Sequence, residues 1–587
     1  MKSFTNLKKF IDKHIKNSTN EGILDVFPLG CGVGKSQYIK YKISDCLNDG
    51  TGIIIVTDSV NRLNDYIGTD NDDLVSYISR NKTKIAILNA DNINEEVKTL
   101  DYKSIVLLTT QRYFSMTRKE IANLTTYHSG SRSVILFDER PYLHENIRID
   151  ISVVDMVDIA IHTTLDNNVN QAEKEWLCTQ WQTFISRFKA IVKALESQNK
   201  EYQYDVWYDK LHTITENDEE FLRLINKYRK NLNINDCTLY KKLLAIVQMA
   251  ENGARFISYK KSKSTDNCSV NVYENYFSVI VDNTPKILNI GAKCFVLDGT
   301  AAVMPDYDAD FVNMVDCSAF QRTFGNLTIK FIDMPYTAKN KLCGKDGNSI
   351  VKNIKDYADS LPYAIDGVFS FKDCGKAFKE HFAIYDYFGN IKGKNEYNQL
   401  SNLLQVGVFR YPDIVYSDIA GMNILQKNSK VVYKSMTDTA FQAKCKEMMY
   451  RYIAADIEQN LFRSKIRHAD CKDKVIYTIL MNCREYNGVI EIIRQRFPKA
   501  KIEVESIPTM FLKLKTESRK NKNESVSQKI IDWVSTKPKG TVFKTSEMCV
   551  ALGINQRQLD KTKSKNKSLV KIFHAMQTDK KGYYCIQ

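Results

Sequence analysis

The sequence predicts an α/β protein, in which short buried strands and helices surround a phosphate-binding loop. Three observations indicate this class. An apolar strand at 23–27 is followed by a glycine-rich loop and then by a helical stretch at 37–46. A second apolar strand at 133–137 ends in the acidic pair Asp138-Glu139, and further apolar runs of strand length recur along the chain. Strand, glycine-rich loop and helix in this order are the context that a Walker A motif requires.

Length and composition describe a soluble protein of several domains. The chain has 587 residues, 43% hydrophobic and 26% charged, which is ordinary for globular proteins but too long for a single core. No apolar run approaches the roughly 20 residues of a membrane span. The amino-terminal segment 1–17 is basic and amphipathic and lacks the apolar core of a signal peptide. We therefore expect a cytoplasmic protein with no membrane partner.

The cysteines and the net charge indicate the redox environment of the protein and the kind of partner that it binds. The 14 cysteines are scattered without a CxxC pair, as expected for reduced thiols. The formal net charge of +15 favours a polyanionic partner. The segment 525–587 holds 12 lysines and arginines against 4 aspartates and glutamates, a net +8, so over half of the excess charge lies near the carboxyl end.

The glycine-rich loop has the residue types that a nucleoside triphosphate requires. Its glycines let backbone N–H groups turn inward around an anion, and the following helix directs its positive end at the phosphates. Lys35 can reach the β- and γ-phosphates, and the Ser36 hydroxyl can bind Mg²⁺. Leu29 stands where the general pattern has its first glycine. The predicted binding loop for ATP and Mg²⁺ comprises Gly30, Cys31, Gly32, Val33, Gly34, Lys35 and Ser36.

The acidic pair supplies the second half of the predicted site. A Walker B motif requires an acid at the end of a core strand beside the loop, where it holds Mg²⁺, and an adjacent acid can activate water. Asp138 is the predicted metal ligand and Glu139 the predicted base. Their position roughly 100 residues after the loop is typical of such enzymes.

With these two motifs in place, the chain resembles the superfamily 2 (DEAD/DEAH-like) helicases from about Asp25 to Arg467. Residues 52–59 are similar to motif Ia, 105–111 to motif Ib or Ic, and 295–301 to motif III. A plain core strand is the alternative interpretation of each. The resemblance implies that hydroxyls at these strand ends contact nucleic acid, namely Thr57, Thr109, Thr110 and Thr300.

The resemblance also implies a second RecA-like lobe. Residues 367–371 resemble the motif IV strand, and 388–395 with the strand 405–409 resemble the motif V region. Residues 456–467 resemble motif VI, for which a solvated basic helix face is the alternative. The two lobes are then expected to close on ATP and Mg²⁺ at their interface.

Motif VI supplies the predicted contacts from the second lobe. The family places a glutamine and two arginines across the cleft from ATP, here Gln459, Arg463 and Arg467. An arginine suits this task because its fixed charge lets hydrolysis sense closure of the lobes. Arg467 falls eight residues after Gln459, where seven is usual, so Arg463 fits the motif better.

Two further segments lie outside the two-lobe pattern. Over 150 residues separate Glu139 from Phe295, and apolar residues at helical spacing within them predict helices at 177–195, 221–228 and 239–249, finished by a hairpin at 255–282. The expected domains are lobe one at 1–150 and 286–325, a mainly helical insert at 151–285, lobe two at 326–515, a linker at 516–524 and a winged helix at 525–587.

The carboxyl-terminal segment resembles a winged-helix domain. It predicts helices at 526–534, 545–552 and 556–567, then a hairpin of 569–573 and 583–586 around a turn at 578–582. Residues able to reach DNA from the start of the third helix are Gln556, Arg557 and Lys561. A winged helix used for protein contact is the alternative, although the net charge favours DNA.

Two features of the sequence differ from common patterns of the helicase family and bear on which of its subfamilies the chain resembles. Arg140-Pro141 replaces the Ala-Asp or Ala-His that usually follows the acidic pair, which leaves the subfamily open. Iron–sulfur helicases of the family carry four cysteines between the loop and the acidic pair, and none occurs between Cys46 and Asp138. We therefore expect no iron–sulfur cluster.

The sequence thus predicts an ATPase that translocates on or unwinds nucleic acid, with DNA preferred over RNA and replication proteins as candidate partners. A chain this compact resembles helicases of bacteriophages and mobile elements. Two alternatives stay open. A DNA-packaging motor would need a carboxylate cluster after the ATPase lobe, whereas motifs IV–VI follow here. An ATP-switched replication-initiation or regulatory protein would keep the winged helix but show no turnover stimulated by nucleic acid.

Overall fold

The computed structural model of the chain divides into two compact units, Met1–Pro508 and Thr509–Gln587. It describes residues 4–68, 73–88, 97–164, 170–196, 202–207, 218–228, 237–252, 254–265, 268–344, 346–391, 396–428, 439–512, 526–578 and 582–586. The predicted linker at 516–524 and residues 392–395 of the motif V region lie outside the described residues.

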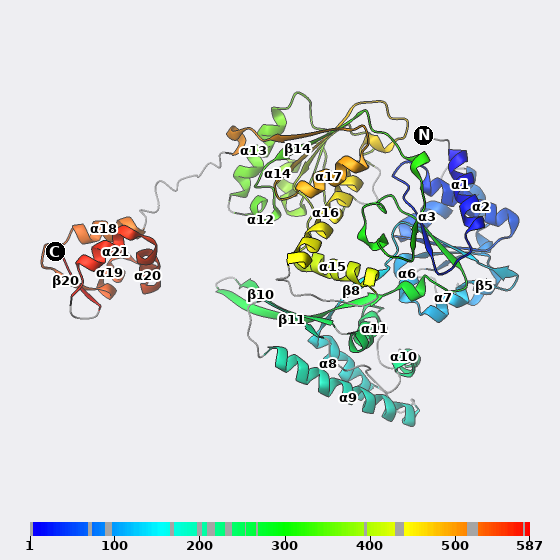
Figure 1. Cartoon of the computed structure of the whole chain (residues 1–587), viewed down its shortest axis with the longest axis horizontal. Helices are drawn as coiled ribbons and strands as arrows, with labels where there is room; N and C mark the ends of the chain where they lie inside the picture. Colours follow the sequence, from blue (N-terminus) through cyan, green and yellow to red (C-terminus); the bar gives the residue numbers. More distant parts are fainter. Residues whose placement is uncertain are drawn as a thin grey trace. The chain divides into compact units, whose positions relative to one another are not determined.

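The first RecA-like lobe is built on a parallel sheet, with helices on both faces (Figure 1). Within the described residues its strand order is β13-β1-β12-β7-β2-β4-β3. Its central strands are mostly apolar and almost entirely buried, as expected for parallel strands covered on both faces. The strands are β1 (Leu24–Phe27), β2 (Ile53–Thr57), β3 (Ile85–Leu88), β4 (Ile105–Thr109), β7 (Val134–Asp138), β12 (Lys293–Leu297) and β13 (Val312–Met314). The helices include α1 (Phe4–Asn17), α2 (Lys35–Asp49), α3 (Val60–Ile67), α4 (Asp73–Arg80), α6 (Thr110–Ser115) and α7 (Arg118–Leu124).

This topology brings the predicted motifs of lobe one to a single edge of the sheet. All of its strand pairs are parallel, so the carboxyl ends of the strands lie together. Asp138 at the end of β7 is in register with Thr57 of β2 on one side and with Leu297 of β12 on the other. β1, which leads into the glycine-rich loop, pairs with β12. The loop, the acidic pair and motif III therefore meet at one edge.

The second RecA-like lobe repeats this architecture. Its described strands run in the order β16-β15-β17-β18-β14-β19, and every pair is parallel. The predicted motif IV strand is confirmed as β15, and the predicted motif V strand is confirmed as β17, which begins three residues earlier than expected. The strands are β14 (Leu327–Asp333), β15 (Gly367–Ser370), β16 (Tyr385–Tyr387), β17 (Asn402–Val406), β18 (Val475–Met481) and β19 (Lys501–Ser506). The helices are α12 (Lys339–Leu342), α13 (Gly347–Asp359), α14 (Gly375–Lys379), α15 (Asp413–Asn428), α16 (Thr439–Leu461) and α17 (Asn487–Arg496).

The insert in lobe one is mainly helical, as predicted, and its hairpin is part of a larger antiparallel sheet. The predicted helices and hairpin are confirmed, as α9 (Gln171–Glu196), α10 (Asp218–Lys227), α11 (Cys237–Asn252), β10 (Ala254–Thr265) and β11 (Cys268–Asp282). The hairpin is part of an antiparallel sheet of order β8-β11-β10-β9 within the described residues. The strands β8 (His144–Asp150) and β9 (Tyr202–Trp207) were not predicted, because their short polar alternation lacks an apolar run. The insert thus begins with β8, before residue 151.

One face of this sheet packs against helices, and the insert also contacts lobe two. Figure 1 shows α8 (Ile151–Ile159) and α9 on the same side of the β10–β11 hairpin, and buried apolar residues from these helices and strands form one core. Arg255 of β10, in the insert, is buried. Its guanidinium group donates to the hydroxyl of Ser417 and lies 3.4 Å from a carboxylate oxygen of Asp418, and both of these residues are on α15 of lobe two. An ion pair out of water is retained only when both charges have partners. Movement of lobe two must therefore carry the insert or break this pair.

The carboxyl-terminal unit confirms three predicted helices and corrects the hairpin. It contains α18 (Val526–Ser535), β20 (Val542–Lys544), α19 (Thr545–Leu552), α20 (Gln556–Lys565), α21 (Lys567–Ala575) and β21 (Tyr583–Cys585). Residues 569–573, expected as a strand, belong to α21, because Leu569 and Phe573 are buried at helical spacing. The strand β21 pairs antiparallel with β20, and Gln577 forms only an isolated bridge with Tyr584. The Cys585 amide also donates to the Met576 carbonyl at 2.8 Å.

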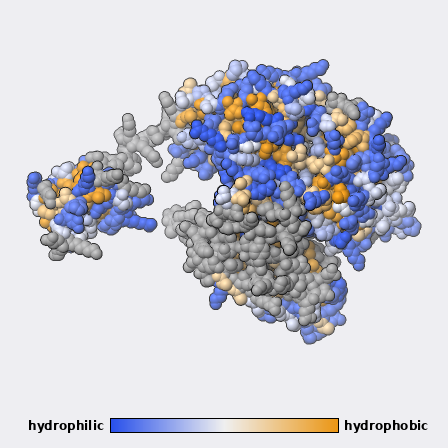
Figure 2. Space-filling view, in the orientation of Figure 1, coloured by the Kyte–Doolittle hydropathy of each residue, from blue (hydrophilic) through white to orange (hydrophobic). Residues whose placement is uncertain are grey.

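Among the coloured residues of Figure 2, hydrophilic residues predominate and hydrophobic residues gather in small groups. Within the described parts of the chain, no helix combines the length and apolar character needed to cross a membrane.

Candidate nucleotide cleft

The glycine-rich loop is shaped by two glycines with left-handed backbone. Gly32 has φ 79° and Gly34 has φ 106°, values that side chains with a Cβ rarely adopt. A Cβ atom at Gly32 would overlap the carbonyl oxygen of Arg467 in lobe two. The loop therefore requires glycine at 32 for its own turn and for the close approach of the second lobe.

Lys35 at the first turn of α2 lies across this loop. Its ammonium group donates a hydrogen bond to the Leu29 carbonyl at 2.9 Å, and its side chain is buried. Burial alone would lower the pKa of Lys35, but the carboxylates of Glu139 and Asp138 are close enough to raise it above its ordinary value. A charged ammonium is thus held where the loop would place phosphates.

The acidic pair follows β7 in an unusual backbone conformation. Glu139 has φ 88°, a left-handed value that costs a non-glycine residue about 1–3 kcal/mol and that clusters at functional sites. Its amide donates to the Leu297 carbonyl at 3.1 Å, which fixes the turn against motif III. Burial raises the pKa of Glu139 to about 7, with Lys35 opposing this shift. A carboxyl group with that pKa is suited to accept a proton near neutral pH.

Asp138 and Ser36 provide oxygen atoms that fit a magnesium ion. Asp138 is buried, and its Oδ1 atom has no hydrogen-bond partner among the described residues. Its other oxygen, Oδ2, accepts a hydrogen bond from the Tyr66 hydroxyl. Burial raises the pKa of Tyr66 well above its ordinary value, and a hydrogen bond with Ser36 opposes this rise. The two predicted ligands therefore share a neighbour, and carboxylate and hydroxyl oxygens are ligands that Mg²⁺ accepts.

Lobe two brings the predicted arginine of motif VI to this cluster. Arg463 follows α16 and is half-buried, and its amide donates to the Asn460 carbonyl at 3.0 Å. Burial lowers the pKa of Arg463 and the neighbouring Arg467 lowers it further, whereas Cys31 of the loop and Glu139 oppose the shift. The segment that follows Arg463 reaches the loop, because the Arg467 carbonyl lies against Gly32.

The other two predicted residues of motif VI lie close by. Arg467 ends a short 3-10 helix (Lys465–Arg467), and its backbone carbonyl approaches Gly32. Gln459 is half-buried on the last turn of α16, next to Glu458. The catalytic roles of Gln459, Arg463 and Arg467 stay predictions.

Two arginines that the sequence analysis did not single out connect the lobes at this point. Arg322, between the lobes, donates to the carbonyl of Cys31 at 3.3 Å and to the carbonyls of Ile466, Arg467 and His468 at 2.7, 3.1 and 2.9 Å. Arg496 of α17 donates to both carboxylate oxygens of Glu458 at 2.8 and 2.9 Å and to the Gly299 carbonyl at 2.9 Å. Neither belongs to a contiguous motif, because their partners come together only in the folded chain.

Further contacts join motif III and its surroundings to α16. Arg140, the departure from the family pattern, donates to Asp306 at 3.0 Å and to the Tyr452 hydroxyl at 3.1 Å. Arg451 of α16 binds both carboxylate oxygens of Asp308, at 2.5 and 3.0 Å. The two lobes are thus in direct contact through charged side chains on both sides of the loop.

The four hydroxyl residues predicted to contact nucleic acid lie at the carboxyl edge of the lobe-one sheet, but each has an internal contact. Thr57 donates to Asp58 at 3.3 Å, and Thr110 donates to the Thr57 carbonyl at 3.1 Å. Thr109 caps α6, and Thr300 donates to the buried Asp298 at 2.9 Å. Their contact with nucleic acid stays a prediction.

The predicted DNA-contact residues of the carboxyl-terminal unit lie on the first two turns of α20. Asn555 caps this helix through a capping box with Gln558, and the left-handed Gly553 ends α19 just before it. Gln556, Arg557 and Lys561 are all exposed. Gln556 also donates to Asp560 on the same helix at 3.0 Å. Helix α20 therefore presents polar and basic side chains to solvent.

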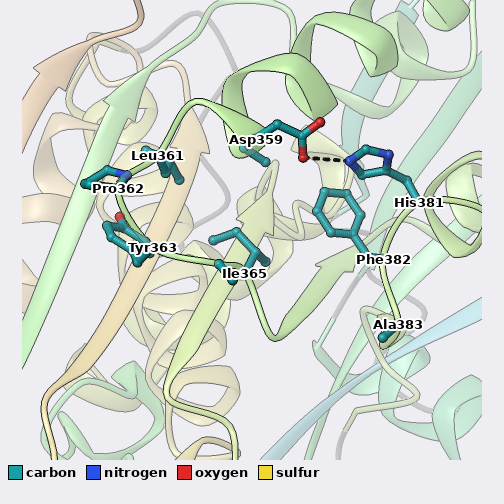
Figure 3. A pocket seen from close by; sticks show the side chains of 10 residues that line it. Asp359, Leu361, Pro362, Tyr363, Ile365, His381, Phe382 and Ala383 are labelled. Atoms are coloured by element: carbon teal, nitrogen blue, oxygen red, sulfur yellow. Dashed lines mark hydrogen bonds and ion pairs between the residues drawn. The ribbon is translucent and has the colours of Figure 1, made fainter.

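Lobe two also has a hollow of about 500 Å³, and the residues that line it are not those of the nucleotide cleft (Figure 3). Its lining residues 358–365 precede β15 and residues 381–383 precede β16, so it opens at the amino ends of the parallel strands. His381 and Asp359 are paired there at 2.9 Å. The nucleotide cleft lies at the carboxyl ends of the strands, and this hollow therefore belongs to a different face of lobe two.

Comparison with known proteins gives matches among solved structures alone. No protein-family model matches the sequence, and no curated protein matches it. S. tokodaii Xpd4 is similar over 85% of this chain and 99% of its own, with 12% identity and a TM-score of 0.43. The DEAD-box helicase Mss116 bound to ssRNA is similar over 94% of this chain and 82% of its own, with 12% identity and a TM-score of 0.31. The DUF1998 helicase MrfA bound to DNA is similar over 100% of this chain and 56% of its own, with 9% identity and a TM-score of 0.31.

Proposed function

We propose that the chain hydrolyses ATP in the cleft between its two RecA-like lobes and uses the lobe motion to translocate on or unwind nucleic acid. The observation that carries this proposal is the convergence of both lobes on one loop. Lys35 and Glu139 come from lobe one, and the segment of lobe two that follows Arg463 lies against the loop through the Arg467 carbonyl. A site completed by two lobes makes hydrolysis depend on their closure.

The proposed chemistry assigns a task to each group. Lys35 and the loop amides bind the phosphates, and Glu139 takes a proton from the attacking water. Arg463 stabilises the charge that develops on the transferred phosphoryl group. Asp138 and Ser36 would hold Mg²⁺, which supplies charge neutralisation at the phosphates when it is bound.

DNA as the preferred partner is supported by the carboxyl-terminal unit. This segment has a net charge of +8, and Arg557 and Lys561 are exposed on α20. Exposed basic side chains attract phosphates of any sequence, and polar side chains at the start of such a helix can reach base edges. We propose that this unit, as a winged helix, anchors the motor on duplex DNA.

The experiment is strand displacement from a forked DNA duplex and from a matched RNA duplex. The wild-type chain should displace the strand with ATP and Mg²⁺ but not with a non-hydrolysable ATP analogue, and Glu139→Gln should displace none. Displacement without hydrolysis would contradict the proposal. Turnover of ATP with neither displacement nor movement along a single strand would instead favour an ATP-switched binding protein.

A further inference from the structure

Two cysteines that are far apart in the sequence lie side by side on lobe two. Cys343 directly follows α12, and Cys374 ends a 3-10 helix (Lys372–Cys374) that begins two residues after β15. Their sulfur atoms are 3.5 Å apart, although 31 positions separate the residues in the chain. Both are free thiols in the structure. The two sulfur atoms are therefore in contact, and a bond between them would require an approach to about 2.05 Å.

The segments that carry these thiols are also joined by an ion pair. Lys339 on α12 lies 3.0 Å from Asp373, the residue before Cys374. The Cys343 amide donates to the Lys339 carbonyl at 2.9 Å, so this residue continues the turn of α12. The side chains of Lys339 and Asp373 are both more than half exposed, and such an ion pair contributes little stability alone. The thiol pair thus belongs to a surface junction between two separate segments.

The two thiols differ in their access to solvent. Cys343 is exposed, whereas Cys374 is buried. Burial raises the pKa of Cys374 to about 12, and its hydrogen bond with Cys343 contributes to the rise. The thiolate is the form that attacks an oxidant, so a buried thiol that rarely ionises reacts slowly. An oxidant in solution therefore meets Cys343 first, and Cys374 is already in contact with the sulfur atom that reacts.

Cys374 is held more firmly than Cys343. Its amide donates to the Phe371 carbonyl at 2.9 Å, and the Tyr385 hydroxyl of β16 donates to the same carbonyl at 2.5 Å. A Cβ atom at the next residue, Gly375, would lie 3.1 Å from the Tyr385 ring, so the backbone here is packed closely against β16. Cys343 instead follows a helix of four residues at the surface. The movement that bond formation requires is therefore expected on the side of Cys343.

We propose that Cys343 and Cys374 form a reversible disulfide bond, which makes this junction a redox modification site of lobe two. The oxidant is a small disulfide, for which oxidised glutathione is the probe. The Cys343 thiolate attacks one sulfur of the probe, forms a mixed disulfide and releases one glutathione thiolate. Cys374 then gives its proton to solvent and attacks the Cys343 sulfur, and the second glutathione thiolate leaves. Two electrons thus pass from the protein dithiol to the probe, and the released thiolates take up the protons.

The bond is expected to follow the redox state of the surroundings. In a reducing compartment the two thiols stay free, as they are in the structure. Exposed disulfides are the ones that external thiols reduce most readily, and Cys343 gives such a thiol access to the finished bond. This inference is independent of the proposed function, because neither cysteine is among the residues assigned to the nucleotide cleft.

The test is oxidation of the folded full chain in glutathione buffers of increasing oxidised fraction, without nucleotide. After acid quenching, the remaining thiols are alkylated in denaturant, and peptide mass spectrometry measures the fraction of chains in which Cys343 and Cys374 are joined. This fraction should rise to a majority of chains and return to none with dithiothreitol. In urea it should be severalfold lower, because only the folded chain brings the two sulfur atoms together.

Two variants separate the roles of the thiols. Cys374→Ser should stop at the mixed disulfide of Cys343 with glutathione, because no second thiol can complete the reaction. Cys343→Ser should leave Cys374 alkylatable, because a buried thiol does not meet the oxidant. Cys471→Ser, at a half-buried cysteine of lobe two, is the matched control and should keep the bond between Cys343 and Cys374.

Three results with the wild-type chain would overturn the assignment, and none depends on the folding of a variant. The first is a mixed disulfide that accumulates at Cys343 while Cys374 stays alkylatable, which would show that the contact is packing alone. The second is a bond from Cys343 to a different cysteine. The third is a joined fraction that is the same in folded and urea-treated chains. A chain that hydrolyses no ATP would refute the proposed function and leave this inference unaffected.

Discussion

The nucleotide cleft and the carboxyl-terminal unit both carry many charged side chains, but in opposite settings. In the cleft, Lys35 and Asp138 are buried, and Arg322 donates to four backbone carbonyls. In the carboxyl-terminal unit, Arg557 and Lys561 are exposed on a helix surface. Burying a charge is costly unless it has partners, so a chain retains buried charges where chemistry or a fixed contact requires them.

The two settings predict different behaviour. A buried group with several partners acts at short range in a low dielectric, and its removal should abolish a chemical step. An exposed cation acts through a field that salt screens beyond about 8–10 Å, and its removal should weaken binding by a graded amount. The cleft should therefore respond to single substitutions, and the carboxyl-terminal unit should respond to the number of charges removed.

Substitutions of Lys35 and Glu139 should have the most severe consequences. Lys35→Ala removes the charge on the phosphates and should abolish hydrolysis. Glu139→Gln keeps the size of the side chain but cannot take a proton, so nucleotide binding should persist while turnover falls by roughly 10²–10⁴-fold. Steady-state ATPase assays and binding of a fluorescent ATP analogue measure both effects. Lys40→Ala on the same helix α2 is the control, and normal turnover by Glu139→Gln would show that the base is misassigned.

The arginines of motif VI come next in severity. Arg463→Ala should leave nucleotide affinity nearly intact and lower kcat by roughly 10³-fold, as expected for an arginine finger. Arg467→Ala should have a smaller effect, because its spacing of eight residues after Gln459 departs from the motif. Single-turnover hydrolysis separates the two variants. If Arg467 alone is required, motif VI is shifted in register, and lobe two contributes a different side chain.

Arg322 should act through Arg463, with a smaller effect on turnover. Arg322→Ala removes the donors that hold the segment after Arg463 against the loop, and misplacement of that segment by about 1 Å should lower kcat by roughly 10²-fold. Arg322 affects turnover by positioning Arg463, so the two substitutions disturb the same contact with the nucleotide. The effect of Arg463→Ala on kcat should therefore be smaller in a chain that already carries Arg322→Ala. Arg322→Lys, which lacks the planar fork, should restore little. Additive effects of the two substitutions on kcat would contradict this role, and melting temperatures control for impaired folding.

Removal of residues 525–587 should have the mildest effect on hydrolysis. Basal ATPase activity should persist, while duplex affinity falls and its dependence on salt becomes shallower, by about 0.9 in log–log slope for each DNA phosphate that the unit neutralises. Within the full chain, Gln556 and Arg557 substitutions should relax any sequence preference, and Lys561→Ala should weaken binding to all sequences alike. Fluorescence anisotropy over a range of salt concentrations measures these quantities. An unchanged slope after truncation would indicate a protein partner for this unit.

The sequence was sufficient to place the parts of the cleft that lie within short segments. The loop at Gly30–Ser36 and the acids after β7 are contiguous motifs, and the apolar runs that lead into them are confirmed as strands of one sheet. The contacts of Arg322 and Arg496 could not be predicted, because they depend on atoms tens to hundreds of residues away. The strands β8 and β9 and the pairing of β20 with β21 were missed for a related reason, since short strands of this kind are specified by their neighbours rather than by an apolar pattern of their own.

The central claim is that hydrolysis in the cleft depends on both lobes and on nucleic acid. The most direct measurement is the ATPase rate of the full chain with Mg²⁺, alone and with saturating single- and double-stranded DNA and RNA, for the wild type and for Arg463→Ala. The account predicts a low rate without nucleic acid, a marked increase with it, greater with DNA than with RNA, and no such increase in Arg463→Ala. A wild-type rate that is the same with and without every nucleic acid, or an Arg463→Ala variant that is stimulated like the wild type, would contradict it.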